Sequence, residues 1–250
     1  MAIKNKVVII MGATSGMGRA TALKLNKEGA KVFISGRRKE RLEEIAKEVA
    51  YPENLKYLTA DVSQPQEVRA VIDQAIADFG RVDVLFNNAG VMPLGRLSDP
   101  NYDISVWKRI FDTNLIGVLN GIKAVLPQMQ KQQSGLVIST SSVVGHVVMP
   151  AGAAYSASKF GVRAIMETLR QEENQNGIRS AIISPGATNT ELIHSIGNEA
   201  IEKNLSESFG NDADYSLRAE DIANAVAYIV DQPEHVDVNE MIIRPRKQEI

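Results

Sequence analysis

Cysteine is absent from the 250-residue sequence. This absence excludes disulfides, thiolate nucleophiles and cysteine-ligated metal sites, and it favours a reducing compartment such as the cytoplasm. The three histidines, His146, His194 and His235, also lack the spacing that places two metal ligands on one face of a helix. We therefore expect a cytoplasmic protein without a metal site.

An excess of charge of one sign is also missing, as are long hydrophobic runs. The 28 basic and 30 acidic residues give a formal net charge of −2, so there is no broad basic field of the kind that binds nucleic acid. The N-terminal apolar run covers only residues 7–11, which is too short for the core of a signal peptide. No stretch approaches the apolar length of a membrane-spanning helix. We expect neither nucleic acid nor a membrane as a partner.

What the sequence does contain is a regular alternation of strand and helix patterns. Its 250 residues, 44% of them apolar, suffice for one domain with a sizeable core. Strands joined by helical crossovers predict an α/β fold, a doubly wound, Rossmann-type parallel sheet with helices on both faces, as a single domain over residues 1–250. The expected strands are residues 7–11, 32–35, 55–60, 82–86, 136–138, 178–184 and 241–243. The expected helices are residues 16–28, 38–49, 65–79, 103–131, 153–176 and 219–230.

Residues 187–217 interrupt this alternation. They are mixed and polar, with scattered apolar positions, and they show no clear periodicity. Long irregular insertions in a compact domain are often functional. We expect this segment, called the lid segment below, to close over a substrate.

Three glycines lie in the turn between the first strand and the first helix. Gly12, Gly16 and Gly18 have the spacing G-x-x-x-G-x-G. Glycines let the backbone turn tightly and approach a pyrophosphate, and the helix N-terminus adds amide donors and a favourable dipole. An ordinary strand-to-helix turn would tolerate one or two glycines, so three favour a dinucleotide site.

Tyr155 and Lys159 are four residues apart near the start of the expected helix 153–176. This spacing makes two side chains neighbours on one face of a helix. Ser142 lies just beyond the fifth expected strand. Because the carboxyl ends of parallel strands form the ligand crevice, we expect Ser142 and the glycine-rich turn at the same edge of the sheet.

Together these motifs resemble the classical short-chain dehydrogenase/reductase family over essentially the whole chain. Two positions depart from the family pattern. Met11 stands where many members have threonine, and residues 238–245 lack the diglycine ending common among members that act on acyl thioesters. The matching motifs, in family order, are Gly12-x-x-x-Gly16-x-Gly18, Asp61-Val62, Asn87-Asn88-Ala89-Gly90, Asn114, Ser142, Tyr155-x-x-x-Lys159 and Pro185-Gly186.

The resemblance implies a catalytic tetrad of Asn114, Ser142, Tyr155 and Lys159. Tyr155 would give a proton to a carbonyl oxygen in reduction and take it back in oxidation. Free tyrosine titrates near ~10, so the positive charges of Lys159 and of an oxidised nicotinamide would favour the phenolate. Ser142 would hold the substrate oxygen, and Asn114 is assigned in the family to a helix distortion that positions a water beside the lysine. Each residue alone is also compatible with packing or capping.

The resemblance further implies a set of cofactor contacts around the crevice. Asp61 would contact adenine, although it could instead cap the helix that begins near Pro65. The loop after the sixth strand would face the nicotinamide carboxamide. The residues implied are Gly12, Thr14, Ser15, Gly16, Met17, Gly18, Arg37, Arg38, Asp61, Val62, Asn88, Ala89, Gly90, Tyr155, Lys159, Pro185, Gly186, Thr188 and Thr190.

The end of the second strand bears on cofactor choice. NAD-binding Rossmann sites usually have Asp or Glu there to accept from the ribose 2′-hydroxyl. Here Gly36 takes that position and Arg37 follows, and a guanidinium suits a 2′-phosphate. We expect NADP(H), with Arg37 as the main contact and Arg38 open to interpretation as a solvated helix residue.

The leading hypothesis is an NADP(H)-dependent oxidoreductase that moves a hydride between the nicotinamide and a carbonyl or secondary alcohol of a small, largely apolar molecule. The alternatives are a non-catalytic NADP(H)-binding regulator, which would not need Tyr155, and a sugar-nucleotide epimerase, which would usually have a longer substrate domain. The resemblance also implies a homodimer or homotetramer formed through helices 103–131 and 153–176. The expected pocket residues are Met92, Leu94, Val143, His146, Val148, Leu192, Ile193 and Ile196.

Overall fold

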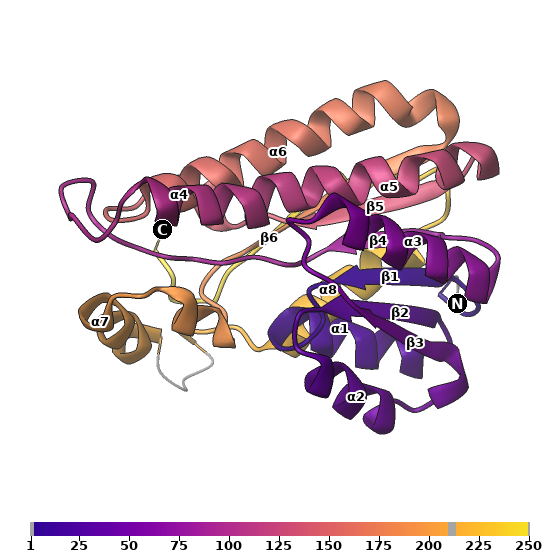
Figure 1. Ribbon diagram of the computed structural model, residues 1–250, viewed down its shortest axis with the longest axis horizontal. Helices are drawn as coiled ribbons and strands as arrows, with labels where there is room; N and C mark the ends of the chain where they lie inside the picture. The colour runs from indigo at the N-terminus through magenta and orange to yellow at the C-terminus, as the bar shows by residue number, and fades with distance from the viewer. Residues whose placement is uncertain (1–2, 210–213, 250) are drawn as a thin grey trace.

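The computed structural model describes residues 3–209 and 214–249. Seven parallel strands form one sheet in the order β3-β2-β1-β4-β5-β6-β7 (Figure 1). This confirms the predicted doubly wound sheet. The strands are β1 (Val7–Met11), β2 (Lys31–Gly36), β3 (Leu55–Thr59), β4 (Val84–Asn87), β5 (Gly135–Thr140), β6 (Ile178–Pro185) and β7 (Glu240–Ile243).

Helices cover both faces of the sheet because its central strands are apolar on both sides. In β1, Val8 and Ile10 belong to one buried cluster and Ile9 and Met11 to the other, as the two-residue period of a strand requires. One face is covered by α1 (Gly16–Lys27), α2 (Lys39–Glu48) and α8 (Ala219–Asp231) (Figure 1). The other face is covered by α3 (Pro65–Phe79), α5 (Gly117–Gln132) and α6 (Ala153–Glu173).

Local sequence signals fix the ends of several helices. Pro65 occupies the first turn of α3, where its missing N–H costs nothing, and Gly80 ends the helix at φ 80°. Gly29, at φ 88°, ends the turn after α1 in the same way. Two short 3-10 helices, Pro52–Asn54 and Asn174–Asn176, lie outside the expected elements or at their ends.

The long helix expected at residues 103–131 is interrupted. It consists of α4 (Ile104–Phe111), a π-helical turn at Asp112–Ile116, and α5. The carboxylate of Asp103 caps α4 by accepting from the backbone N–H groups of Ser105 and Val106. The π-turn inserts an extra residue around Asn114, and such insertions are frequent at functional sites.

The lid segment is more regular than expected. It contains a 3-10 helix at Glu191–Ser195 and the helix α7 (Glu199–Phe209), and α7 lies apart from the two helical layers (Figure 1). Residues 210–213 of this segment lie outside the described residues. Asn198, a typical capping residue, precedes α7 in the sequence. In the structure its side chain accepts from the backbone N–H of Ile201.

Candidate active site

A cavity of about 1120 Å³ opens at the carboxyl edge of the sheet. It lies where the strand order reverses between β1 and β4, the usual ligand crevice of an open α/β sheet. Nearly all the residues expected in the site line it. The two exceptions are Gly18 and Asn114, which lie behind its wall.

The glycine-rich turn forms one wall of the cavity. Gly12 has φ 84°, and a Cβ atom there would lie 2.5 Å from the backbone of Ala89, so only glycine fits. Gly18 does not face the cavity, because a Cβ atom there would collide with the carbonyl of Gly12. Its part is to let α1 pack closely under the turn. Ser15, the N-cap residue of α1, makes no side-chain cap, which leaves the first amides of the helix to face a ligand.

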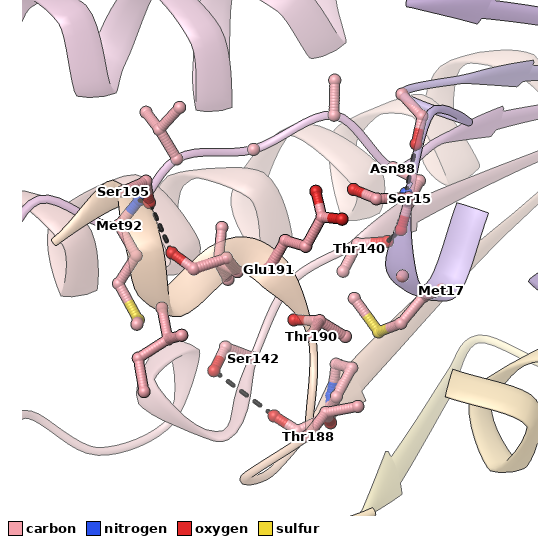
Figure 2. Close-up of a pocket in the computed structure, with 18 of the residues that line it drawn as sticks. Ser15, Met17, Asn88, Met92, Thr140, Ser142, Thr188, Thr190, Glu191 and Ser195 are labelled. Carbon is pink, nitrogen blue, oxygen red and sulfur yellow. Dashed lines mark hydrogen bonds between the residues drawn. The ribbon is translucent and has the colours of Figure 1, made fainter. Parts of the chain in front are cut away.

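Polar contacts join this turn to the neighbouring strands. The side-chain amide of Asn88 donates to the carbonyl of Gly12 over 2.8 Å, and Thr140 donates to the Asn88 side chain over 3.2 Å (Figure 2). These bonds fix the spacing between β1, β4 and β5 at the crevice. Ala89 and Gly90 continue the same wall.

Asp61 and Val62 line the cavity just after β3. The Asp61 carboxylate accepts from the backbone and hydroxyl of Ser63, while Gln64 is the N-cap residue of α3. The alternative that Asp61 caps this helix is therefore wrong. Its side chain holds a local turn and borders the cavity.

Ser142, Tyr155 and Lys159 meet at the centre of the cavity wall. Ser142 is the N-cap of a 3-10 helix at Val143–Gly145. Its hydroxyl donates to the Pro185 carbonyl over 3.3 Å and lies beside the Tyr155 phenol. Tyr155 and Lys159 lie in the first two turns of α6 and are only 5% and 4% exposed. The Lys159 ammonium donates to the Thr140 carbonyl over 2.8 Å and lies 5.7 Å from the centre of the Tyr155 ring.

Burial controls the protonation of these two groups. It raises the pKa of Tyr155 to about 12, although the neighbouring Ser142 hydroxyl opposes this shift. Burial also lowers the pKa of Lys159 to about 8. In the ligand-free protein Tyr155 therefore keeps its proton at neutral pH.

Asn114 supports this group from behind. It lies in the π-turn, and its side-chain oxygen accepts from the Val91 N–H over 2.9 Å. Its side-chain nitrogen donates to the Val91 carbonyl over 3.0 Å and to the Ser158 hydroxyl over 3.1 Å. A Cβ atom at Gly90 would lie 3.5 Å from the Asn114 side-chain oxygen and 3.8 Å from the Lys159 nitrogen. The π-turn thus places a fully satisfied amide beside the lysine.

The arginines after β2 differ in a way that the sequence does not show. Arg37 is 68% exposed and its nearest carboxylate oxygen, on Asp61, is 3.9 Å away. Arg38 instead lies on the glycine-rich turn, where it donates to the hydroxyls of Thr14 and Ser15, each over 2.8 Å. Arg38 is thus exposed at the start of α2, as a solvated helix residue would be, but its guanidinium is also held on the turn. Gly36 is required here because a Cβ atom would lie 2.6 Å from Thr14.

The far end of the cavity is apolar, but four of the eight expected pocket residues do not line it. Met92, Val143, Leu192 and Ile193 do. Leu94 and Ile196 are buried behind them, at 3% and 2% exposure. Val148 is 75% exposed. His146 turns away to bond Glu240, whose carboxylate also accepts from Ser184.

Comparisons with known proteins agree with this geometry. A family model described as short chain dehydrogenase matches residues 6–201. The chain belongs to the short-chain dehydrogenase family. It is 44% identical to an uncharacterized oxidoreductase of Staphylococcus saprophyticus, covering 99% of both chains.

Two solved structures of short-chain dehydrogenase relatives show the same fold with different cofactors. An alcohol dehydrogenase of the archaeon Thermococcus sibiricus, complexed with 5-hydroxy-NADP, has 29% identity, 99% coverage of both chains and a TM-score of 0.86. A 3-ketoacyl-(acyl-carrier-protein) reductase of Brucella melitensis, complexed with NADH, has 26% identity, covers 98% of this chain and 100% of its own, and has a TM-score of 0.85. This chain is therefore a short-chain dehydrogenase-type oxidoreductase.

The site of this short-chain dehydrogenase suits a nicotinamide dinucleotide. Its cavity exceeds the ~300–1,000 Å³ typical of drug-sized ligands, and it extends continuously from the glycine-rich turn to the Ser142–Tyr155 pair. Within residues 3–209 and 214–249, no cluster of three or more His, Asp or Glu side chains could hold a metal ion. In the same described ranges, no helix is long and apolar enough to cross a membrane.

Several residues that line the cavity of this short-chain dehydrogenase were not among those expected from the sequence. Met149 and Leu205 pack around the apolar end, and the Ser195 hydroxyl accepts from the Met92 N–H over 2.8 Å (Figure 2). The side chain of Gln248 accepts from the Ala187 N–H over 2.9 Å, which attaches the C-terminal segment to the loop after β6. Glu191 reaches the arginines after β2. Only Leu205 had a sequence signal, its four-residue spacing from Ile201 in α7.

Proposed function

We propose that this protein is an NADP(H)-dependent oxidoreductase that transfers a hydride between the nicotinamide and a carbonyl or secondary alcohol of a small, largely apolar substrate. The observation that carries the proposal is the buried Tyr155, which lies beside Lys159 and the Ser142 hydroxyl on the wall of a dinucleotide-sized cavity. A protein that only binds the cofactor has no use for a proton donor held in this way.

The residues of the site divide the work of the reaction. A bound nicotinamide supplies the hydride in reduction and accepts it in oxidation. Tyr155 transfers the proton to and from the substrate oxygen, and the Ser142 hydroxyl holds that oxygen in line. Burial lowers the pKa of Lys159 to about 8, so its ammonium is still mostly protonated at neutral pH and favours the phenolate left when Tyr155 gives up its proton. Asn114 positions these groups through Val91 and Ser158.

The remaining contacts hold the cofactor. The turn from Gly12 to Met17 would hold the pyrophosphate, with Gly18 packed behind it. Asp61, Val62, Asn88, Ala89 and Gly90 would border the adenosine. Pro185, Gly186, Thr188 and Thr190 would face the nicotinamide. Arg38, with Thr14, Ser15 and the more exposed Arg37, favours the 2′-phosphate of NADP(H), since no carboxylate stands at Gly36.

A panel of ketones, aldehydes and secondary alcohols tests the proposal. Each is offered with NADPH or NADH, or with NADP⁺ or NAD⁺, and cofactor absorbance is followed. We expect turnover of neutral apolar compounds and a kcat/KM that is higher with the phosphorylated cofactor. The Tyr155→Phe variant, purified identically, controls for contaminating reductases. A preference for NADH would contradict the cofactor part, and equal rates in the two proteins would contradict the catalytic part.

We also propose a cytoplasmic homodimer or homotetramer assembled through α4, α5 and α6. Apolar side chains are exposed on these elements, among them Ile104, Leu119 and Phe160, which are 64%, 42% and 40% exposed. Such a surface suits self-association. Light scattering should give a multiple of the 27.3 kDa chain mass. A 27.3 kDa species alone at micromolar concentration would contradict the assembly.

A further inference from the structure

Glu191, in the lid segment, is ion-paired with the arginines that follow β2. One of its carboxylate oxygens is 2.7 Å from a terminal nitrogen of Arg38, and the other is 3.6 Å from Arg41. The hydrogen bond from Arg38, together with the charges of Arg38 and Arg41 and the nearby Ser15 hydroxyl, lowers the pKa of Glu191. Figure 2 shows the carboxylate extending towards Ser15. An acidic side chain thus occupies a site built from basic and hydroxyl groups.

These donors are the ones that a ribose 2′-phosphate would need. Arg38 offers a planar guanidinium already fixed on Thr14 and Ser15, and such a fork matches phosphate oxygens. A donor hydrogen that bonds Glu191 is not available to a phosphate. In addition, the two anions would repel each other within one cluster of arginines. A phosphorylated cofactor therefore has to displace Glu191, whereas a cofactor with a free 2′-hydroxyl does not.

The ion pair between Arg38 and Glu191 lies where a ligand phosphate can replace the carboxylate. The side chains of Arg38 and Glu191 are 45% and 40% exposed, so solvent screens the pair and its net strength is small. The backbone of the lid segment is held independently, because Ser195 bonds the Met92 N–H and the Leu94 N–H donates to the Ile196 carbonyl over 3.1 Å. Glu191 can then leave the arginines without release of the whole segment.

We propose that Glu191 is a specificity-determining residue that competes with the 2′-phosphate for Arg38 and so moderates the preference for NADP(H) over NAD(H). The inference rests on the proposed use of a nicotinamide dinucleotide. It gives the chain two opposing determinants: Arg38 favours the phosphate, and Glu191 limits that advantage.

The test measures binding rather than turnover. Dissociation constants for NADP⁺ and NAD⁺ are measured by calorimetry on the wild type, Glu191→Gln and Glu202→Gln. The control removes the same charge from the same segment, where Glu202 pairs with His194 over 2.9 Å instead of with an arginine. We expect Glu191→Gln to bind NADP⁺ about three- to fivefold more tightly, given the strength of exposed ion pairs. NAD⁺ binding should stay within about twofold, as should both constants for Glu202→Gln.

A double variant separates this inference from the cofactor assignment. In the Arg38→Ala background, Glu191→Gln should no longer tighten NADP⁺ binding, because the contested donor is gone. An unchanged Kd for NADP⁺ in Glu191→Gln, an equal gain for NAD⁺, or a gain that persists without Arg38 would each overturn the proposal. If the wild type binds NAD⁺ more tightly, the NADP(H) assignment fails, but the change in the NADP⁺ to NAD⁺ ratio still decides the part played by Glu191.

Discussion

The two ends of the cavity hold their polar groups by different means. At the catalytic end, Tyr155 and Lys159 are about 95% buried and meet neutral hydroxyl and carbonyl partners. At the adenosine end, Arg38 and Glu191 form a half-exposed ion pair. A buried group cannot exchange its protein partner for water, so its pKa shifts and its removal is costly. An exposed charge exchanges partners at little cost, which suits a place where a ligand must replace a side chain.

The largest effect is expected at the buried end, for Tyr155→Phe. The substitution removes the transferable proton and almost no volume, so kcat should fall by about 10²- to 10⁴-fold. Binding of the oxidised cofactor should change far less, because the walls of the cavity remain. Steady-state kinetics on the best substrate and calorimetry with NADP⁺ measure the two quantities. A loss of kcat smaller than about tenfold would mean that the buried pair does not perform the proton transfer.

The second test of the buried end compares how the free energy of unfolding depends on pH in the wild type and in Lys159→Met. The pKa of Lys159 is lowered by burial from 10.5 to about 8, so the unfolded chain binds more protons between pH 8 and 10.5. The free energy of unfolding of the wild type should therefore rise with pH over this window, by ~2 kcal/mol from pH 7 to 9.5. Methionine has no charge to bury, so the variant should lack this rise and be the more stable protein at pH 7, although inactive.

Urea denaturation at pH 7 and 9.5 measures this difference. Lys123→Met, the same substitution at an exposed position of α5, is the control and should show the wild-type pH dependence. If Lys159→Met still gains stability with rising pH as the wild type does, the lysine does not carry the burial cost that distinguishes its end of the cavity.

The buried end was also the more predictable from sequence. The four-residue spacing of Tyr155 and Lys159 places them together wherever α6 lies, and the end of β5 brings Ser142 to the same edge through the topology alone. The π-turn was visible only through the family resemblance. The apolar residues keep their helical spacing through residues 112–116, so the pattern predicts an uninterrupted helix. The hydrogen bonds that stabilise the π-turn join Asn114 to Val91, 23 residues away.

The exposed end depends on contacts that no local pattern encodes. Arg38 and Glu191 are 153 residues apart. Exposed charges have many alternative partners of nearly equal energy, so neither spacing nor propensity selects one. This is why the sequence favoured Arg37 as the main phosphate contact, whereas the structure fixes Arg38 on the glycine-rich turn.

A smaller effect is expected from the arginines on cofactor choice. Arg38→Ala should lower the ratio of kcat/KM for NADPH to that for NADH by about tenfold, the scale of one charge-assisted hydrogen bond. Arg37→Ala should lower it less, because Arg37 is mostly exposed and is not held on the turn. High salt should weaken both effects, unlike those at the buried end. A larger effect for Arg37 would restore the order expected from the sequence.

The smallest effect is expected from Arg38→Ala on the stability of the ligand-free protein. The substitution removes the ion pair with Glu191 and the bonds to Thr14 and Ser15. Because Arg38 and Glu191 are half-exposed, water can solvate the carboxylate left behind, and such pairs contribute about 0–1 kcal/mol. The free energy of unfolding from urea denaturation should thus fall by less than ~1 kcal/mol, and by less still at high salt, which screens the pair in the wild type. A loss above ~2 kcal/mol would show that the arginine is a structural support of the glycine-rich turn, and the adenosine end would then be built on the same principle as the catalytic end.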